Sequence, residues 1–281
     1  MRKIPFILIL SFLLSISTSC SKDNDDTDTS PLEAKSMLNV EYGSSSHQKY
    51  DIYLPKNRTK DTKVLILIHG GGWNAGDKSE MDAFKDFIRE QLPEIAVVNM
   101  NYRLADMNHP PYPMQINDID NVVNELRKKA KEFHISTEIG FIGASAGAHL
   151  SLLWSYAHDT QKQVKMVCSI VGPTNFLDKA YLNTTNQDLR GLLDQFGNSS
   201  ELLKEASPLY QLTSNAPPTI LFYGAKDPLI PISQGIDLRD KLMELNVKHQ
   251  FTLYPEGGHG WVGIDLMDTS LKLKAFIQEN L

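Results

Sequence analysis

Three side chains that could together perform nucleophilic catalysis each follow a predicted strand. Ser145 lies in the pattern Gly-Ala-Ser-Ala-Gly, residues 143–147, between a short strand and a helix, and Asp227 and His259 lie on loops after two later strands. A serine hydroxyl becomes a strong nucleophile when an adjacent imidazole takes its proton and a carboxylate orients that imidazole. The chain order serine, aspartate, histidine is one in which such triads occur. We therefore predict that Ser145, Asp227 and His259 form a catalytic triad.

A glycine-rich segment could supply the groups that stabilise a negatively charged intermediate. The sequence HGGGW, residues 69–73, follows the apolar strand VLILI. Its three glycines let the backbone approach a ligand closely, and free N–H groups are the donors that a tetrahedral oxyanion needs. We predict an oxyanion hole made by the N–H groups of Gly71, Gly72 and Ala146. His69 is predicted to hold this loop in place and not to act as the base.

Other histidines and acids are less well placed for these roles. His149 lies within the helix that follows Ser145. Glu256, the nearest rival acid, is too close in sequence to His259 to lie on a neighbouring strand end. The remaining histidines lack the placement after a strand that is expected of the base, namely His47, His109, His134, His158 and His249.

Strands and helices alternate along the chain, which predicts an α/β fold of one domain with a mostly parallel central sheet and helices on both faces. The predicted strands are 38–42, 49–54, 64–68, 95–100, 139–142, 164–171, 219–223 and 249–254. The predicted helices are 79–91, 113–133, 146–156, 234–245 and one that begins at 263. The first two strands alternate apolar and polar residues, as half-exposed antiparallel strands do.

Composition excludes several classes of protein. The 281 residues are 41% hydrophobic and 22% charged, which is an ordinary globular balance and not that of a wholly disordered chain. A net charge of −6 gives no electrostatic basis for binding nucleic acid. The two cysteines, Cys20 and Cys168, are too few for a disulfide framework. Cys168 is predicted to be a buried strand residue.

The N-terminus has the character of an export signal. A basic start, a short apolar run and a small-residue exit predict a signal peptide over residues 1–19. Cys20 resembles the lipid-modified cysteine of bacterial lipoproteins. We expect residues 20–36 to combine this lipid anchor with a flexible acidic tether. The expected location is the outer membrane, on its periplasmic or cell-surface face. The sequence does not indicate an oligomeric state.

These motifs carry a resemblance to a known fold family over nearly the whole chain after the tether. From about Asn39 onward the chain resembles an α/β-hydrolase of the esterase/lipase type, through LIHGGGWNAGDK (67–78), GASAGAHL (143–150), FYGAKDPLIP (222–231) and GGHGW (257–261). The first stretch is especially similar to the bifunctional feruloyl and acetyl xylan esterases. The resemblance implies a catalytic domain over residues 37–281.

The same resemblance implies hydrolysis of carboxylic esters through an acyl-enzyme, with a small acyl ester or an acetylated glycan as substrate. It implies no metal and no organic cofactor. Trp73 and Trp261, which end two of the motifs, are expected to line the substrate pocket. Asn101-Tyr102-Arg103 and Asp118 also match family positions, and we expect them to support the oxyanion loop and the wall of the site.

Two alternative functions remain open at this point. The HGGGW segment also fits the loop of kynurenine formamidases, which hydrolyse an amide with the same triad. The predicted signal peptide disagrees with the intracellular role of those enzymes. The second alternative is a non-catalytic surface lipoprotein that uses the fold for binding. No triad or oxyanion residue is missing from this sequence, which disfavours that reading.

The spacing of the elements gives an expectation about substrate size. The first predicted strand begins near Leu38, which leaves no length for the N-terminal cap domain of hormone-sensitive-lipase-like relatives. A single sizeable insertion lies between Val171 and Thr219, and whether it acts as a lid stays open. We expect a partial wall, a small acyl pocket, and kcat/KM values that are highest for acetyl to butyryl esters.

Overall fold

The computed structural model describes residues 31–281. The predicted signal peptide at 1–19, the lipidation site Cys20 and the tether up to residue 30 lie outside the described residues. Within 31–281, no helix combines the length and the apolar character that crossing a membrane requires. The chain enters its first strand at Lys35, shortly before the predicted start of the catalytic domain, because Lys35 already pairs with Leu54 of the next strand.

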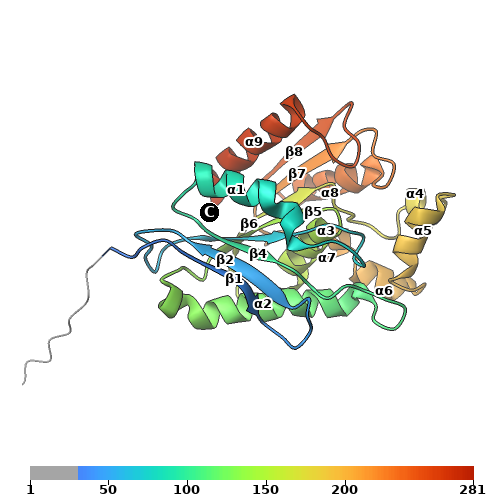
Figure 1. Ribbon diagram of the computed structural model, residues 1–281. Coiled ribbons are helices and arrows are strands. Elements are labelled where there is room, and N and C mark those ends of the chain that lie inside the picture. Colours follow the sequence, from blue (N-terminus) through green and yellow to red (C-terminus); the bar gives the residue numbers. More distant parts are fainter. Residues whose placement is uncertain (1–30) are drawn as a thin grey trace, which may run out of the picture. The chain divides into compact units, whose positions relative to one another are not determined.

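The centre of the fold is an eight-stranded sheet (Figure 1). Its strands are β1 (Lys35–Glu41), β2 (Lys49–Leu54), β3 (Val64–Ile68), β4 (Ala96–Met100), β5 (Ile139–Ala144), β6 (Val164–Ile170), β7 (Thr219–Gly224) and β8 (His249–Tyr254). They lie in the order β1-β2-β4-β3-β5-β6-β7-β8. All neighbours from β4 to β8 are parallel, whereas β2 is antiparallel to both β1 and β4. The mostly parallel sheet and the two antiparallel strands at its start are therefore confirmed.

The helices cover both faces of this sheet. The α-helices outside the insertion between β6 and β7 are α1 (Asp82–Gln91), α2 (Pro111–Phe133), α3 (Ala146–Leu153), α8 (Ile232–Glu244) and α9 (Ile264–Asn280). Helices α1 and α9 pack together on one face, and α2 covers the other face beside α3 (Figure 1). Parallel strands covered on both faces should be apolar throughout, and every residue of β3 and β4 is buried. The predicted α/β-hydrolase layering is confirmed.

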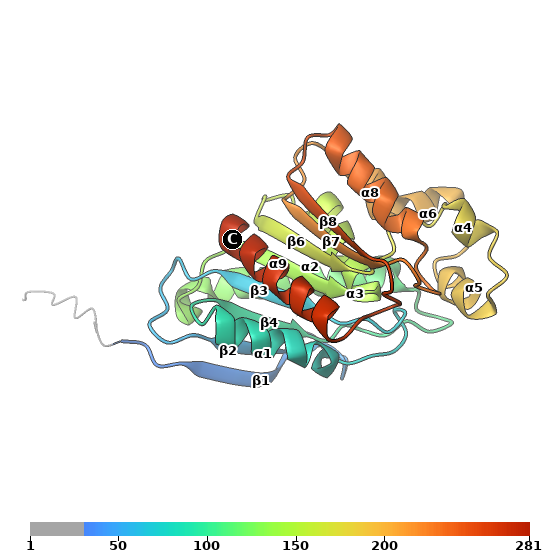
Figure 2. The same cartoon turned by 90° about the horizontal axis from the view of Figure 1, so that it is seen from above.

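The insertion between β6 and β7 folds into four short helices. They are α4 (Lys179–Leu182), α5 (Gln187–Asp194), α6 (Ser200–Glu205) and α7 (Pro208–Gln211). Figure 2 shows α4, α5 and α6 gathered beyond one end of the sheet. Among the described residues no helix precedes β1. Within the described chain, the insertion is therefore the segment that could cover the carboxyl edge of the sheet, where the predicted triad lies.

Helices α2 and α3 contain irregularities that their predicted bounds do not include, and the predicted helix over 79–91 begins as a 3₁₀ helix, Lys78–Met81, before α1. Helix α2 starts at Pro111 but is interrupted at Tyr112, which has extended backbone angles (φ −105°, ψ 132°) because the residue before Pro113 is pushed out of the helical region. Helix α3 ends at Leu153 and continues as a wider π-helical turn, Trp154–His158. The sequence pattern does not distinguish this turn from a continuing α-helix.

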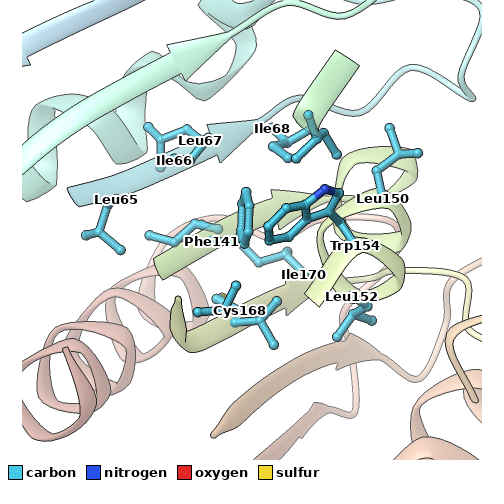
Figure 3. Packing of buried hydrophobic residues seen from close by; sticks show 14 of the residues in the cluster. Leu65, Ile66, Leu67, Ile68, Phe141, Leu150, Leu152, Trp154, Cys168 and Ile170 are labelled. Atoms are coloured by element: carbon cyan, nitrogen blue, oxygen red, sulfur yellow. The ribbon is translucent and has the colours of Figure 1, made fainter. Parts of the chain in front are cut away.

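The core lies where β3, β5 and β6 meet helix α3. Ile66 pairs with Phe141 in the strand register, and Ile66, Phe141 and Trp154 pack around this contact (Figure 3). The rings of Phe141 and Trp154 lie 5.5 Å apart in an edge-to-face arrangement. Cys168 is fully buried on β6, as predicted. Burial raises the pKa of its thiol far above the usual range, so the thiol is not available as a nucleophile. This packing anchors the turn that carries Ser145.

Candidate active site

Ser145 occupies a sharp turn between β5 and α3. Its backbone has φ 51° and ψ −117°, a conformation that L-residues rarely adopt. Both flanking glycines are required by close approach, because a Cβ on Gly143 would collide with the carbonyl of Gly147, and a Cβ on Gly147 would collide with the carbonyl of Ile68. The glycines of the pattern therefore let the turn close and press the helix start against β3, which leaves the serine side chain at the carboxyl edge of the sheet.

The three predicted triad residues lie in one hydrogen-bonded line. Nε2 of His259 is 2.9 Å from Oγ of Ser145, and Nδ1 of His259 is 2.8 Å from Oδ2 of Asp227. The Asp227 side chain is 1% exposed and that of His259 is 28% exposed. With Nδ1–H donating to the carboxylate, Nε2 is free to accept the serine proton. The arrangement has the geometry that serine activation needs.

The Asp227 carboxylate is held in place from both of its oxygens. Oδ1 accepts hydrogen bonds from the backbone N–H groups of Leu229 at 2.8 Å and Ile230 at 3.0 Å, and Oδ2 faces His259. This Asx-type turn follows directly from an aspartate placed before Pro228. The carboxylate is thus pre-oriented before any ligand binds.

The loops after β7 and β8 are joined to each other, which brings Asp227 and His259 together. The backbone N–H of Lys226 donates to the carbonyl of Gly257 at 2.8 Å, and a Cβ on Gly224 would collide with the carbonyl of Gly258. The rival acid Glu256 pairs with Lys226, and its side chain is 77% exposed. Its carboxylate is therefore engaged at the surface and is not the group beside His259.

The predicted oxyanion loop has a strained backbone. Gly71, Gly72 and Trp73 have φ values of 96°, 56° and 66°, and a Cβ on Gly71 would collide with the carbonyl of Ala75. Within residues 31–281, the N–H groups of Gly71, Gly72 and Ala146 donate no hydrogen bond. The loop and the first residue of α3 therefore present free donors beside Ser145, in keeping with the predicted oxyanion hole.

Trp73 anchors this loop to the helix that carries Ser145. Its indole Nε1 donates to Nδ1 of His149 at 3.1 Å, and Nε2 of His149 donates to the carbonyl of Ala206 at 2.7 Å. The rings of Phe176 and Phe196 complete an aromatic cluster around this pair. Burial lowers the pKa of His149 to about 4, so the imidazole is neutral and can accept from the indole. His149 thus has a supporting place and does not contact the triad.

His69 lies beneath the oxyanion loop and is fully buried. Its Nδ1 donates to the carbonyl of Gly70 at 2.8 Å, and its ring stacks on Tyr102 with centroids 4.3 Å apart. The Tyr102 hydroxyl donates to the carbonyls of His69 at 3.0 Å and Gly70 at 2.8 Å. Burial lowers the pKa of His69, which keeps it neutral. These contacts hold the loop and give His69 no role as a base.

The neighbouring residues of the NYR segment extend the same support. Asn101 donates to the carboxylate of Asp77 at 2.7 Å. The guanidinium of Arg103 donates to the buried carboxylate of Asp118 through Nη2 at 2.6 Å and Nε at 3.0 Å. Gln115, which the sequence analysis did not single out, donates to the carbonyl of Trp73 at 2.6 Å. The loop is therefore clamped from helix α2 as well as from helix α3.

A cavity of about 440 Å³ opens beside Ser145. Its walls are mostly apolar and come from the oxyanion loop, the start of α1 and the turn before it, the segments that follow β6 and β7, the start of α9 and the insertion. The side chains that line it include Trp73, Met81, Phe84, Ile170, Val171, Tyr181, Leu189, Leu192, Leu193, Leu229, Ile230, Trp261 and Leu266. This volume is that of the whole cavity, for the acyl and alcohol parts of an ester together, so the small acyl pocket stays a prediction.

The insertion reaches directly onto the oxyanion loop. A Cβ on Gly72 would collide with a methyl group of Leu192 on α5, and Gln195 donates to the carbonyl of Gly72 at 3.2 Å. The apolar spacing of Leu189, Leu192, Leu193 and Phe196 is that of an amphipathic helix, which was the available signal that α5 would cover the site. The insertion therefore forms part of the active-site wall.

The two predicted pocket tryptophans have different surroundings. Both line the cavity, but Trp73 is only 3% exposed because its ring fills the aromatic cluster. Trp261 donates through Nε1 to Thr269 at 2.7 Å, and its ring packs on that of Tyr254 with centroids 4.6 Å apart.

Within residues 31–281 no group of three or more His, Cys, Asp or Glu side chains lies together in a way that could hold a metal ion.

Comparisons with known proteins agree with this architecture. A family model described as BD-FAE matches residues 50–242. Esterase LipC of Mycobacterium tuberculosis is 28% identical over 247 residues, which cover 82% of this chain and 60% of that protein. The kynurenine formamidase of Danio rerio is 22% identical over 219 residues, which cover 65% of this chain and 70% of that protein.

A probable isoprenylcysteine alpha-carbonyl methylesterase of Arabidopsis thaliana is 25% identical over 260 residues, and the match covers 82% of this chain but 51% of that protein. The chain therefore spans between about half and two thirds of the length of this relative and of LipC.

Solved structures with the same fold include several esterases. A truncated carbohydrate esterase from gut microbiota superposes with a TM-score of 0.71 at 23% identity, over 86% of this chain and 96% of that chain. An acetyl ester-xyloside bifunctional hydrolase from Caldicellulosiruptor lactoaceticus gives a TM-score of 0.68 at 17% identity, over 82% of this chain and 88% of that chain. At these identities the likeness establishes a common fold.

Proposed function

Because the chain belongs to the BD-FAE family of α/β-hydrolases, we propose that it hydrolyses carboxylic esters through an acyl-enzyme formed on Ser145. The observation that carries this proposal is the continuous line of hydrogen bonds from Asp227 through His259 to Ser145. The esterases among its relatives support the same reaction class.

In the proposed mechanism, Oγ of Ser145 attacks the ester carbonyl while Nε2 of His259 takes the hydroxyl proton. The Asp227 carboxylate stabilises the resulting imidazolium and keeps Nδ1–H pointed toward itself. His259 then gives the proton to the leaving alcohol, and the acyl group stays on Ser145. Water attacks the acyl-enzyme by the same route in reverse, with His259 again as the base, and releases the carboxylic acid.

Charge on the carbonyl oxygen needs donors that are in place before the reaction. The N–H groups of Gly71, Gly72 and Ala146 serve this role in the proposal, because they are free within the described chain and the loop that carries two of them is clamped by Trp73 and Gln115. Donors that need no reorganisation stabilise an oxyanion most, and losing one costs about 3–4 kcal/mol of transition-state stabilisation.

For the substrate we propose short acyl esters of carbohydrates, with an acetyl or a feruloyl group as the acyl part. Carbohydrate esterases among the structures of the same fold support this choice. The cavity of about 440 Å³ has room for an acetyl group and also for the larger aromatic acyl group. Its apolar leucine wall suits an aromatic ring, since apolar contact area contributes about 25 cal/mol per Å² buried.

An amidohydrolase of the kynurenine formamidase type is the second candidate. It is favoured by the similarity to the formamidases of Danio rerio and Salmo salar, and the same triad would serve it. A non-catalytic binding lipoprotein is disfavoured by the intact hydrogen-bonded triad.

We also propose that Cys20 carries a lipid that attaches the protein to the outer membrane. Cys20→Ala should then move the protein into the soluble fraction of its host.

The deciding experiment compares hydrolysis rates of the full-length protein on four substrates: acetylated xylo-oligosaccharide, a feruloylated oligosaccharide, N-formylkynurenine and 4-nitrophenyl acetate. We expect turnover of the esters and a much lower rate on the amide. Ser145→Ala should abolish turnover by about 10⁶-fold while circular dichroism and thermal unfolding stay those of the wild type. Turnover that survives in Ser145→Ala would refute the proposed nucleophile, and a preference for N-formylkynurenine would favour the amidohydrolase.

A further inference from the structure

Glu80 is an exposed acidic side chain in the wall of the cavity beside Ser145. It lies in the short 3₁₀ helix Lys78–Met81, which follows the oxyanion loop. Apart from His259, it is the one Asp, Glu, Lys, Arg or His side chain among the described residues that line the cavity. The wall is otherwise mostly apolar, so Glu80 supplies its fixed charge.

The carboxylate of Glu80 is held close to the base of the oxyanion loop. Its Oε1 accepts from the backbone N–H of Asp77 at 3.3 Å, as part of a capping box at the start of the 3₁₀ helix. Gly76, the residue before Asp77, lies against the loop, because a Cβ there would collide with the His69 ring and the carbonyl of Gly70. The bond to Asp77 therefore keeps the charge beside the loop.

The negative charge of Glu80 reaches the residues beneath this loop. Burial raises the pKa of Tyr102, and the charge of Glu80 raises it further. Burial lowers the pKa of His69, whereas its bond to Gly70 and the charge of Glu80 act against that lowering. Because the Tyr102 hydroxyl donates to the carbonyls of His69 and Gly70, the field of Glu80 extends to the floor of the oxyanion loop.

The charge of Glu80 is not neutralised by a neighbouring cation. Glu80 forms no ion pair within residues 31–281. The two lysines nearest to it in sequence are engaged elsewhere, since Lys78 pairs with Asp51 at 3.3 Å and Lys85 pairs with Asp82 at 2.9 Å. The field of the carboxylate therefore acts on a ligand that enters the cavity.

The structural role of Glu80 does not require a charge. Glutamine serves at this position of a capping box as glutamate does, and Asp77 already accepts from the N–H of Ser79 at 2.9 Å. An amide would therefore cap the helix equally well. What a glutamate adds is a negative charge at the cavity, which repels anions and attracts cations.

We propose that Glu80 makes the active site charge-selective, so that it accepts esters that are uncharged or cationic and discriminates against anionic ones. For a carbohydrate ester, this means a neutral sugar in preference to a sugar that carries a carboxylate, such as a uronic acid. The selection acts through space and needs no direct contact with the substrate. This inference rests on the proposed esterase function and adds to it a specificity-determining residue.

The test uses Glu80→Gln in the full-length protein and two pairs of isosteric esters. Glu80→Gln removes the charge and keeps an oxygen that can accept from Asp77. In the alcohol pair, 4-acetoxybenzamide is compared with 4-acetoxybenzoate, and in the acyl pair, methyl 4-carbamoylbenzoate is compared with monomethyl terephthalate. Each pair exchanges a neutral amide for a carboxylate of the same shape.

The quantity measured is the kcat/KM ratio of amide to carboxylate in the wild type, divided by the same ratio in the variant, which cancels the intrinsic reactivity of the esters. We expect this double ratio to be about fourfold in at least one pair at low ionic strength, the effect of unit charges roughly 10 Å apart at an effective dielectric constant of about 40. The pair that responds identifies the part of the ester that lies nearer to Glu80.

Salt separates an effect of charge from an effect of shape. The Debye length falls from about 30 Å at 0.01 M ionic strength to about 3 Å at 1 M, so the double ratio should approach unity at the higher salt concentration. A double ratio below about twofold in both pairs at low salt, half of the expected effect, would overturn the inference and leave the esterase function standing. A larger ratio that salt does not reduce would also overturn it. Absence of hydrolysis of all four esters by the wild type would overturn the proposed function and this inference with it.

Glu90→Gln is the matched control, because it removes the same charge from another place on the molecule. Glu90 is exposed on α1 and does not line the cavity, and its Oε1 accepts only a long bond of 3.4 Å from the neighbouring Gln91. Its double ratio should stay near unity in both pairs. An equal response of Glu90→Gln and Glu80→Gln would assign the selectivity to the net charge of the protein and contradict the place given to Glu80.

Discussion

The indole of Trp73 donates a hydrogen bond to His149, 3.1 Å away, and so joins the oxyanion loop to the helix that begins beside Ser145. Trp73 itself has a positive φ of 66°, a backbone conformation that costs about 1–3 kcal/mol and persists only where surrounding contacts impose it. The bond to His149 and the packing of the aromatic cluster supply those contacts. The loop that presents Gly71 and Gly72 is therefore held in place by Trp73, a side chain that the sequence predicted as part of the substrate pocket.

Trp73→Phe should lower kcat more than it raises KM. The variant keeps an aromatic ring but leaves Nδ1 of His149 buried without a donor, which costs about 1–3 kcal/mol of stability and loosens donors that act in the transition state. The measurements are kcat and KM on 4-nitrophenyl acetate and thermal unfolding. Trp154→Phe is the matched control, because the equally buried Trp154 has no partner for its Nε1 within residues 31–281. Equal losses of kcat in the two variants would contradict this role of the bond.

Asp227→Asn should leave the protein folded and reduce kcat by about 10⁴-fold, because an amide facing Nδ1 favours the wrong tautomer of His259. The side-chain oxygen can still accept from Leu229 and Ile230, as Oδ1 does now. Glu256→Gln is the control and should change kcat little, since its exposed pair with Lys226 is worth at most about 1 kcal/mol. The opposite pattern in steady-state kinetics would move the acid role to Glu256.

The stability of the fold should fall between pH 6.5 and pH 4 through His149. Its pKa is lowered by burial to about 4 in the folded chain, against about 6.5 when unfolded. The unfolded state therefore binds the proton first as pH falls, and about 3 kcal/mol of stability is lost across this window. Denaturant unfolding at several pH values measures it. His149→Gln should have a shallower pH dependence than the wild type, whereas the exposed His47→Gln should not. Parallel curves for wild type and His149→Gln would rule out this contribution.

Gly72→Ala should impair catalysis through Leu192 on α5, because the new methyl group would collide with the end of that side chain. Leu192→Ala removes the obstacle, so we expect the double variant to recover part of the kcat/KM lost in Gly72→Ala. Gly71→Ala is the contrasting variant, since its methyl group would meet the backbone of Ala75 and no side-chain substitution can relieve that contact. A double-mutant cycle on 4-nitrophenyl acetate measures the coupling. Simple additivity of Gly72→Ala and Leu192→Ala would show that α5 does not bear on the loop.

The sequence by itself determined the parts of this protein that depend on local sterics and on spacing. The apolar run of β3, residues 64–68, requires a strand buried on both faces, and the glycines around Ser145 permit the sharp turn between β5 and α3. The order of strands and helices then predicts which loops meet at the carboxyl edge of the sheet. Ser145, Asp227 and His259 were identified on this basis, and the structure brings them together.

Only the tertiary structure decided how residues distant in sequence share the same space. The loops after β7 and β8 join so that Asp227 faces His259 while Glu256 turns to the surface. The insertion folds back so that Leu192 and Tyr181 wall the cavity. A side chain's partner depends on the packing of several elements at once, and no local pattern in the chain encodes that packing.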